Sequence, residues 1–508
     1  MGAQIKPELF FALVGPVGAD LGSLQRALTK ELATLDYELC PTPHRLIELL
    51  FKLNAWTKLK KVASADPSKR YPPLMDAGNE FRTRIKRADA MALFAAADIW
   101  ANERKRRDDP LPGRAHIFRS LKRPEEVETL RSIYGSALVV VAAYAPPEAR
   151  RDAISAEIAQ KEGGRAEDYF AQAEQLIARD RDEAEVEYGQ RLSMTFPLAD
   201  VFLDVSDKRK LRANTRRFIE LLFGNPFRTP SREEYAMFQA HGAALRSADL
   251  SRLVGAAITS SDGEVIALGT NEVPKPGGGL YWEGDDPDAR DFNLEQDTSR
   301  ELKIRALAQI LERVGKPPHS LIKGRSPNYQ ELARGMWRTL DGTDIASVTE
   351  WGRTVHAEMA AITDAARRGV PLQGTVMYTT TFPCHNCARH IVAAGIRRVI
   401  FVEPYPKSLA RDLHMDAITV EGEDEWPRNV NFSQFVGVGP RMYRTLFTPI
   451  PDSRRNRDGT PSTWTEAIAS SRVGDAPAAY VRNEFGARTD LLELLKDSGL
   501  QLAKGETI

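Results

Sequence analysis

The sequence has few cysteines, no surplus of either charge and no long apolar run. Three cysteines in 508 residues are too few for a disulfide framework, and such low usage is typical of a reducing compartment. Lysine plus arginine (70) balances aspartate plus glutamate (70), so the basic surplus of proteins that hold nucleic acid by its phosphates is missing. No apolar stretch is long enough for a membrane span, and no signal peptide is recognisable. We expect a cytoplasmic protein without a membrane partner.

Two short segments carry the clearest chemical pattern in the chain. The first, T-V-H-A-E-M-A-A-I, places His356 and Glu358 at the start of an apolar helix. The second, F-P-C-H-N-C, follows a strand-like segment and places Cys384 and Cys387 around a turn that opens the next helix. Together they match the H-x-E…P-C-x-x-C pattern of zinc nucleobase deaminases.

The residue types explain why this pattern indicates hydrolytic chemistry. One imidazole and two thiolates supply three of the four ligands of tetrahedral Zn²⁺ and leave one position open for water. Zinc lowers the pKa of that water to about 7. We expect Glu358, two residues after His356, to shuttle the proton from the water to the base and the departing ammonia.

A structural zinc knuckle is the alternative, and it requires a fourth protein ligand. His385 and His390 lie near enough in sequence to be considered as that ligand. A knuckle would explain neither Glu358 nor a histidine ligand at the start of a distant helix. We therefore interpret the pattern as a catalytic site. The remaining cysteine, Cys40, is expected to be a buried or semi-buried thiol.

Near the N-terminus, a strand-like segment runs into the glycine-containing turn G-P-V-G-A-D-L-G and then a helix. This order is typical of a phosphate-binding loop. The pattern G-x-x-x-x-G-K-[ST] is not met, because Asp20 stands at the second glycine position and the lysine is missing. Two interpretations remain open: a tight strand-to-helix turn, or a degenerate nucleotide-sensing loop that includes Gly15, Gly18 and Asp20.

The alternation of strands and helices predicts an α/β protein of several domains. We expect a P-loop kinase-like, parallel-sheet domain over residues 1–225. An α/β/α cytidine-deaminase-like domain should follow over 226–450, with an insertion at about 282–352 that caps the pocket or builds an oligomer contact. Residues 451–508 read as a flexible linker and a short helical tail.

Four residues are candidates for binding the substrate. A hairpin around Ser261-Asp262-Gly263 should end at Asn271, which could hydrogen-bond a sugar or serve only its own turn. Arg252 suits a phosphate contact or a surface role. Tyr405 and Lys407 follow a strand end, where α/β folds place ligands, so they suit base stacking and phosphate binding, or a simple rim turn.

The chain resembles the bacterial antiphage deoxycytidylate deaminases of the AvcD or DcdV type. The resemblance is carried by G-P-V-G-A-D-L, R-S-L-K-R-P-E-E-V-E-T-L-R-S-I-Y-G, E-Y-G-Q-R-L-S-M-T-F-P-L-A-D-V-F, H-A-E, P-C-H-N-C and E-P-Y-P-K-S, which span most of the chain to about residue 450. It implies deamination of dCTP, dCMP or both, which drains a pool that a phage needs. It also implies homo-oligomers and control by a small non-coding RNA or a nucleotide effector. His356, Cys384 and Cys387 would be the zinc ligands and Glu358 the proton shuttle.

Other functions stay open on the sequence alone. A housekeeping dCMP deaminase that feeds thymidylate synthesis would share the zinc site but would not need the long N-terminal segment. A nucleic-acid-editing deaminase would also share it, although the balanced charge disfavours a nucleic-acid groove. The N-terminal domain could instead be the sensing or partner-binding module, with the deaminase as its effector.

Overall fold

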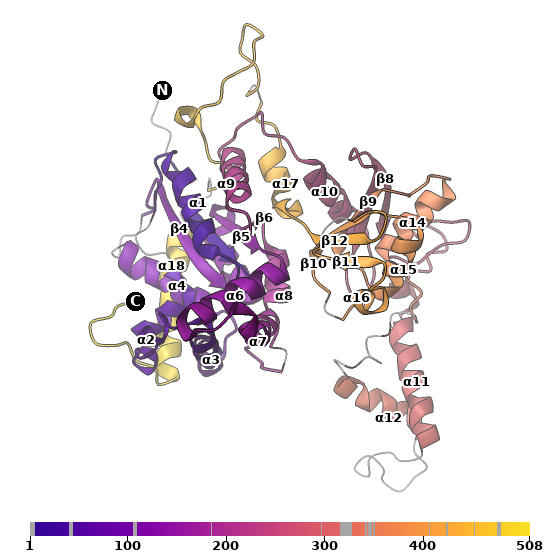
Figure 1. Cartoon of the computed structure of the whole chain (residues 1–508), viewed down its shortest axis with the longest axis horizontal. Helices are drawn as coiled ribbons and strands as arrows, with labels where there is room; N and C mark the ends of the chain where they lie inside the picture. Colours follow the sequence, from indigo (N-terminus) through magenta and orange to yellow (C-terminus); the bar gives the residue numbers. More distant parts are fainter. Residues whose placement is uncertain are drawn as a thin grey trace. The chain divides into compact units, whose positions relative to one another are not determined.

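The computed structural model describes residues 6–508 with internal gaps and shows two compact units (Figure 1). The gaps are 40–43, 105–108, 184, 296, 315–327, 341–342, 344–347, 349–350, 406, 423–424, 452 and 475–478. The first unit comprises Met1–Glu234 and Val436–Ile508, and the second comprises Tyr235–Phe435. Cys40 and the Pro-His-rich turn of the insertion lie outside the described residues. No helix in the described ranges has the length and apolarity needed to cross a membrane.

The first unit is built on a mostly parallel sheet of seven strands. Strand β1 lies in its middle, parallel to β4 and β5, and only β13 runs antiparallel. The side chains of β1 are fully buried, as expected for a strand covered by helices on both faces. In spatial order the strands are β13 (Gly437–Val438), β6 (Val201–Asp204), β5 (Leu138–Tyr144), β1 (Leu9–Val14), β4 (Arg114–Leu121) and β2 (Glu38–Leu39), with β3 (His44–Arg45) also paired to β4.

Helices cover both faces of this sheet. Leu9, Phe11 and Leu13 of β1 share a core with apolar residues of α1, α9 and α17. Phe10, on the other face, stacks on Tyr134 of α5 and meets Tyr480 of α18 edge to face. The helices are α1 (Leu21–Ala33), α2 (Leu59–Val62), α3 (Pro67–Ile85), α4 (Ala90–Asp98), α5 (Pro124–Tyr134), α6 (Pro147–Glu162), α7 (Phe170–Arg181), α8 (Leu192–Thr195), α9 (Lys208–Leu222), α17 (Pro440–Phe447) and α18 (Ala479–Asp497).

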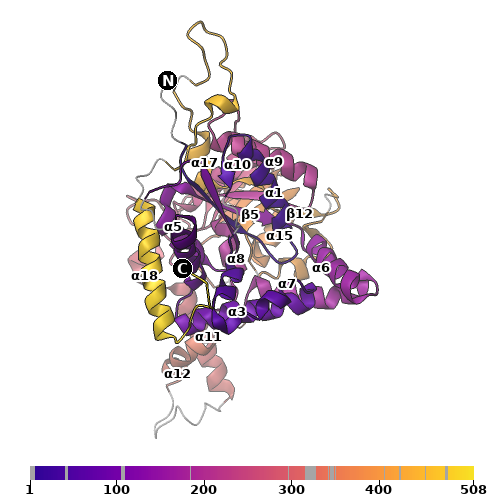
Figure 2. The same ribbon diagram turned by 90° about the vertical axis from the view of Figure 1, so that its left-hand side faces the viewer.

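The C-terminal segment differs from the sequence prediction. Residues after Phe435 return to the first unit, where β13 extends its sheet and α18 packs on α4 and α5. Figure 2 shows α18 beside α5. The segment predicted as a flexible linker forms a turn in which Asn456 N–H donates to Thr460 O (2.8 Å) and Arg454 Nε donates to Pro226 O (2.8 Å). The apolar stripe of α18 explains the difference, because it finds a partner surface on the first unit.

Two stretches of the first unit whose sequence has a helical pattern, residues 44–61 and 80–104, do not form continuous helices. Over residues 44–61, the chain forms β3 and then the 3₁₀ helix η1 (Leu46–Lys52), because pairing of Arg45 with Arg119 of β4 extends the backbone. Over residues 80–104, α3 ends at a left-handed residue, Lys86 (φ 56°), and α4 starts anew at Ala90. In both places tertiary contacts outweigh the local helical pattern.

The second unit has a six-stranded mixed sheet, with β7 antiparallel to both of its neighbours and the remaining pairs parallel. The predicted hairpin is confirmed as β7 and β8. Helices α14 and α15 share a core with one face of the sheet. The strands in spatial order are β11 (Ile418–Val420), β12 (Val430–Gln434), β10 (Arg398–Glu403), β9 (Val376–Thr381), β7 (Gly255–Thr259) and β8 (Val265–Thr270); the helices are α10 (Arg232–Ala244), α14 (Ala357–Arg367), α15 (His385–Ala393) and α16 (Ala410–Leu413).

The insertion in the second unit contains its own helix pair. Helix α11 (Thr298–Val314) packs on α12 (Tyr329–Met336) through a small apolar cluster that includes Leu307 and Ala333. Glu301 and Arg334 join the two helices by an ion pair of 2.6 Å. The described residues of the insertion thus form a helical hairpin; whether it caps the pocket or contacts another subunit stays a prediction.

A close approach between α14 and β8 fixes the start of α14. A Cβ atom added to Gly269 would lie 2.0 Å from the carbonyl oxygen of Ala357, so only glycine at this position lets the helix pack directly on the strand. Ala357 and Ala361 are fully buried in the same contact. The first turn of α14, which carries His356 and Glu358, is therefore held against the sheet.

A buried ionic cluster joins α18 to the rest of the first unit. The Arg104 guanidinium donates to Glu484 Oε1 (2.8 Å) and to Glu8 Oε2 (3.1 Å), and all three side chains are fully buried. Tyr480 donates to Glu8 Oε2 (3.1 Å), and His116 Nε2 lies 2.6 Å from Glu8 Oε1. Burial favours the neutral form of Arg104, but the two carboxylates outweigh it and raise its pKa. A buried charge of this kind depends on its partners.

Replacing Glu484 by alanine should destabilise the first unit by about 3 kcal/mol or more, because Arg104 would keep only one of its two buried carboxylate partners. Denaturant unfolding followed by tryptophan fluorescence would measure the loss. The control is Glu493→Ala on the exposed side of the same helix, which should stay within about 0.5 kcal/mol of the parent. Equal stability of the two variants would contradict the role of the cluster.

Candidate metal centre

Three ligating side chains meet where two helices of the second unit begin. His356 is the N-cap of α14, Cys384 is the N-cap of α15, and Cys387 lies in the first turn of α15. Both N-caps have extended backbone (ψ 154° and 168°) that turns into the helix. Helix N-termini carry partial positive charge, which favours thiolate over thiol.

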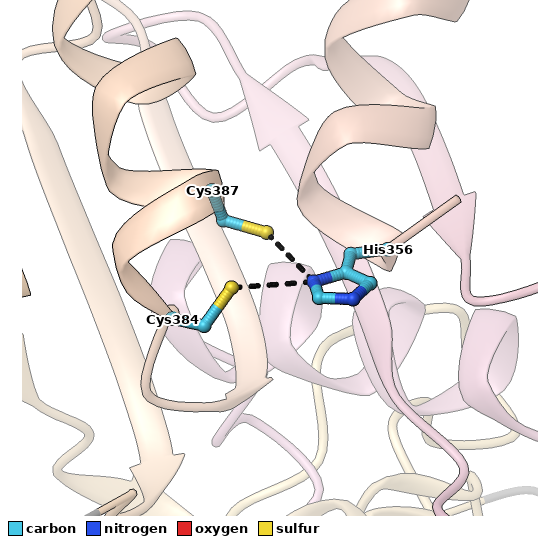
Figure 3. Close-up of side chains that lie close together, drawn as sticks. All are labelled: His356, Cys384 and Cys387. Atoms are coloured by element: carbon cyan, nitrogen blue, oxygen red, sulfur yellow. Dashed lines mark hydrogen bonds between the residues drawn. The ribbon is translucent and has the colours of Figure 1, made fainter. Parts of the chain in front are cut away.

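The distances between the ligating atoms fit a zinc ion. Cys384 Sγ and Cys387 Sγ each lie 3.3 Å from His356 Nδ1 (Figure 3), and the ligating atoms of the three residues all lie within 4.8 Å of one another. Bonds of about 2.3 Å to sulfur and about 2.0–2.1 Å to nitrogen at tetrahedral angles place sulfur and nitrogen about 3.5 Å apart. Across the described parts of the chain, no fourth His, Cys, Asp or Glu joins this cluster. The donor set therefore leaves one tetrahedral position open, as in catalytic zinc sites.

The protonation of the cluster also suits a metal. A hydrogen bond from Cys387, helped by one from His356, lowers the pKa of Cys384 to about 4 although burial opposes this. The hydrogen bond to Cys384 raises the pKa of His356 to about 9, against the effect of burial. In turn, the hydrogen bond to Cys384 and burial raise the pKa of Cys387. The two thiols thus share a negative charge of the kind that a bound metal cation would compensate.

Glu358 lies beside the ligands. Its side chain is buried, and Cys387 Sγ–H donates to Glu358 Oε2 at 3.3 Å. Burial raises the pKa of this carboxyl group, and the negative charge of Cys384 adds to the effect. A carboxyl group whose pKa is raised above its ordinary value holds a proton more readily and is suited to exchanging protons with a substrate. The structure thus brings Glu358 to the place where the sequence predicts a proton shuttle.

Asn271 follows β8, as predicted, but its side chain is engaged by its own loop. Its Oδ1 accepts from Val254 N–H (2.7 Å), and its Nδ2 donates to Arg252 O (2.6 Å). The residue is 7% exposed. These bonds correspond to the turn role that the sequence left open, and a sugar contact by Asn271 stays a prediction.

Arg252 and Tyr405 lie together near the metal ligands, whereas Lys407 is exposed. The guanidinium carbon of Arg252 lies 5.9 Å from the centre of the Tyr405 ring, and Arg252 Nη1 is 3.2 Å from Glu403 Oε1. Tyr405 packs against the core that contains Cys384 and Cys387, and burial raises the pKa of its phenol. Lys407 lies exposed after β10, and its phosphate contact stays a prediction.

Two acidic residues near this site were not singled out from the sequence. Glu403 ends β10 and pairs with Arg252. Asp249 lies near enough to His356 for its charge to raise the histidine pKa, and its Oδ1 accepts from Ser251 N–H (2.8 Å). Glu403 stands in the E-P-Y-P-K-S segment and could have been found there. Asp249 lies in a loop whose sequence carries no distinguishing pattern.

The rejected histidines lie outside the cluster. His390 is exposed on α15, and its Nδ1 lies 2.7 Å from Asn386 O. His385 opens the same helix but is absent from the ligand group. The cluster therefore has the composition of the predicted open site rather than that of a knuckle with a fourth protein ligand.

In the first unit, the predicted nucleotide loop is a packed turn. Gly18 has φ 88°, and a Cβ atom there would lie 2.8 Å from Arg150 O, so the turn requires glycine. Gly15 is buried. Asp20 caps α1, with its Oδ1 accepting from Ser23 N–H at 2.8 Å. These features explain the glycines and the aspartate as a tight strand-to-helix connection, and a nucleotide contact by them stays a prediction.

Comparison with known proteins identifies the region around the cluster. Residues 230–403 match the cytidine and deoxycytidylate deaminase zinc-binding region. The deoxycytidylate deaminase of enterobacteria phage T2 is 33% identical over 97 residues, which are 19% of this chain and 52% of that protein. The deoxycytidylate deaminase of Homo sapiens is 25% identical over 169 residues, 33% of this chain and 63% of that protein. The crystal structure of the dCMP deaminase from cyanophage S-TIM5 in apo form aligns with 41% of this chain and 99% of its own at 14% identity, with a TM-score of 0.22.

The chain spans about half the length of the phage relatives that it matches. The match covers the two segments that supply the ligands, and it leaves the first unit unassigned. Residues 230–403 thus match the cytidine and deoxycytidylate deaminase zinc-binding region, and the His-Cys-Cys cluster lies inside the matched residues.

Proposed function

We propose that this chain removes the amino group of deoxycytidine nucleotides by hydrolysis of the C4–N bond, converting dCTP, dCMP or both to dUTP and dUMP in the cytoplasm. The observation that carries the proposal is the buried Glu358 carboxyl group beside a three-residue zinc ligand set. The family match and the names of the relatives support the choice of deoxycytidylate as substrate.

His356, Cys384 and Cys387 would hold the zinc, and Glu358 would move the protons. When bound, the metal makes a water molecule acidic enough to act as a nucleophile near neutral pH. Glu358 takes one proton from the attacking water and gives it to the ring nitrogen N3 as the C4–O bond forms. It then transfers the second proton to the amino group, so that the C4–N bond breaks and ammonia leaves. Because Glu358 is buried, bulk water does not compete for these protons.

Arg252 and Tyr405 are the residues best placed to receive the rest of the nucleotide. The Tyr405 ring lies near the ligands, where it suits stacking on the base, and Arg252 beside it suits a phosphate. Glu403 holds the guanidinium in the absence of substrate. Asn271 would orient the sugar through its loop, and Lys407 would add positive charge at the rim.

We further propose that the activity serves antiphage defence by draining the deoxycytidine nucleotide pool. The sequence resemblance supports this role, as does the presence of a large additional α/β unit that deamination itself does not need. We infer that this unit has a P-loop kinase-like fold without kinase chemistry, since β1, a glycine turn and α1 lie at the centre of a parallel sheet but the loop lysine is missing. Homo-oligomers and control by a small non-coding RNA or a nucleotide effector belong to the same proposal.

The direct test is ammonia release from the zinc-loaded chain offered dCTP, dCMP, CTP, cytidine, single-stranded DNA and RNA. We expect turnover of dCTP or dCMP alone. Glu358→Gln should lower the rate by about 10²–10⁴-fold or more, because the proton shuttle is lost while size and polarity are kept. Glu264→Gln, on the exposed hairpin of the same unit, is the matched control and should be unaffected.

Turnover of polynucleotide only would replace the proposal by an editing function. Phage infection of cells that carry the parent chain or Glu358→Gln tests the defence role, with deoxycytidine nucleotide pools measured by mass spectrometry. Pools that fall equally in both would contradict it, whereas a constant decline without infection would favour a housekeeping deaminase.

Removal of a metal ligand should abolish zinc binding. Cys384→Ala leaves two protein ligands, so we expect zinc content, measured by plasma mass spectrometry, to fall from near one ion per chain to near zero. His390→Ala on the same helix should keep its zinc, because His390 lies outside the cluster. Loss of zinc from the His390 variant, or full zinc in the Cys384 variant, would show that the ligand set is wrong.

A phosphate contact by Arg252 should appear in substrate binding. Losing a hydrogen bond to a charged group costs about 1.5–3 kcal/mol, so Arg252→Gln should raise the KM for dCMP or dCTP by roughly 10–100-fold. The kcat of the same variant at saturating nucleotide is the internal control and should be nearly unchanged. A fall in kcat with an unchanged KM would mean that Arg252 acts through packing on Tyr405 instead.

A further inference from the structure

The first unit contains a cavity of about 590 Å³ next to the glycine turn between β1 and α1. Its volume lies within the range of small-molecule sites. The turn, η1, α3, β4 and α6 contribute to its wall, so it opens at the ends of β1 and β4 in the parallel sheet. Ligands of open α/β sheets bind at this edge.

The glycine turn itself is closed to an anionic ligand. Val17 N–H donates to Asp180 Oδ2 at 2.7 Å, and Asp180 is fully buried. Lys122 Nζ donates to Gly15 O (2.9 Å) and pairs with Asp180 Oδ1 (2.7 Å). The Asp20 carboxylate caps the start of α1. A phosphate at the turn would therefore meet two carboxylates and an amide that is already bonded.

One cation of the cavity wall is not paired in this way. The wall holds five cationic side chains, and four of them have a carboxylate within 4.0 Å: Arg45–Glu48, Arg70–Glu157, Arg82–Glu126 and Lys122–Asp180. Arg119 has no such partner among the described residues. Its Nη1 donates to the neutral Gln25 Oε1 (2.9 Å), and its Nε is buried without a hydrogen-bond partner. Burial lowers the pKa of Arg119 and the neighbouring Arg45 contributes, while the more distant charges of Glu48 and Asp20 only partly oppose this.

The backbone beside Arg119 is strained. The register of β4 against β1 shifts between Leu13 and Val14, and the extra residue is Ser120, with φ 68°. This left-handed conformation is uncommon for a residue other than glycine and clusters at ligand sites. Ser120 itself lines the cavity. The bulge thus gives a second, independent indication that this end of β4 is shaped for a ligand.

Gln190 supplies a buried hydrogen-bond acceptor to the same cavity. It lines the cavity, is 3% exposed, and its Oε1 is buried without a partner, while its Nε2 lies 3.4 Å from Asn79 Oδ1. An acceptor in this state calls for a ligand N–H group. Phe51 and Tyr71 add aromatic surface to the same wall. An anion, a flat ring and a ring N–H are together the features of a nucleoside phosphate.

We propose that this cavity binds a nucleoside monophosphate, whose phosphate pairs with Arg119 and whose base donates a hydrogen bond to Gln190, while the glycine turn receives no phosphate. The site is separate from the zinc centre and does not depend on the deaminase proposal. It gives the first unit a ligand of the same chemical class as the proposed substrate of the second.

Isothermal titration calorimetry of the full chain tests the site. The probes are the common ribo- and deoxyribonucleoside monophosphates, the matching nucleosides and inorganic phosphate, and the background variant Glu358→Gln prevents turnover. We expect at least one monophosphate to bind with an affinity that Arg119→Gln lowers tenfold or more and Arg119→Lys lowers less. Arg114→Gln, on the same strand but outside the cavity, is the matched control and should leave the affinity unchanged.

Two further variants locate the ligand. Gln190→Leu should weaken nucleotide binding tenfold or more, and Asp20→Asn should change it less than twofold, because the turn is not the phosphate site. Thermal unfolding of each variant verifies that it folds. The proposal is overturned if no monophosphate binds, if binding is independent of Arg119, if inorganic phosphate binds as tightly as the nucleotide, or if Asp20→Asn strengthens binding tenfold. Binding in the zinc centre would be insensitive to Arg119 and is thereby distinguished.

Discussion

The second unit depends on gathering negative charge where water cannot solvate it. A thiolate, a second thiol and a carboxyl group lie within hydrogen-bond distance of one another or of one imidazole, and both cysteines and Glu358 are almost fully buried. Without a cation this arrangement is stable only if protons compensate the charge, which is why the pKa values of Cys387 and Glu358 rise. A divalent metal removes that requirement. Packing on the sheet therefore fixes the helices that carry these residues. The close approach of Ala357 in α14 to Gly269 in β8 is one example.

The first unit also buries a charged group, and there protein side chains compensate the charge. Arg104 is fully buried, and its compensation comes from Glu8 near the N-terminus and Glu484 in the C-terminal helix. This cluster explains how residues separated by the whole second unit in sequence form one fold. Because Glu484 lies in the last helix, Arg104 gains its second carboxylate partner only when the C-terminal segment packs on the first unit. The proposed deaminase is thus inserted into the first unit rather than appended to it.

The sequence allowed prediction of those features that local chemistry determines. His356, Glu358, Cys384 and Cys387 stand out because zinc chemistry requires these residue types at helix starts, and the hairpin before them follows from its Ser-Asp-Gly turn. The α/β class of both units followed from alternating strands and helices. The return of the C-terminal segment could not be predicted, because the charges of Arg104 and Glu484 look like ordinary surface charges until the fold buries them. The same holds for Asn271, whose amide could serve a ligand or its own loop.

The glycine turn of the first unit shows why a motif and its missing residue must be considered together with their surroundings. The absent lysine position is held by Leu21, which is buried in the core of the unit beside α1 and β1. A lysine there would lose that packing and would find the Val17 amide bonded to Asp180. Asp180 in turn neutralises Lys122, the cation that does reach the turn. The turn is therefore held by four groups that pack on or compensate one another: Leu21, the Val17 amide, Asp180 and Lys122.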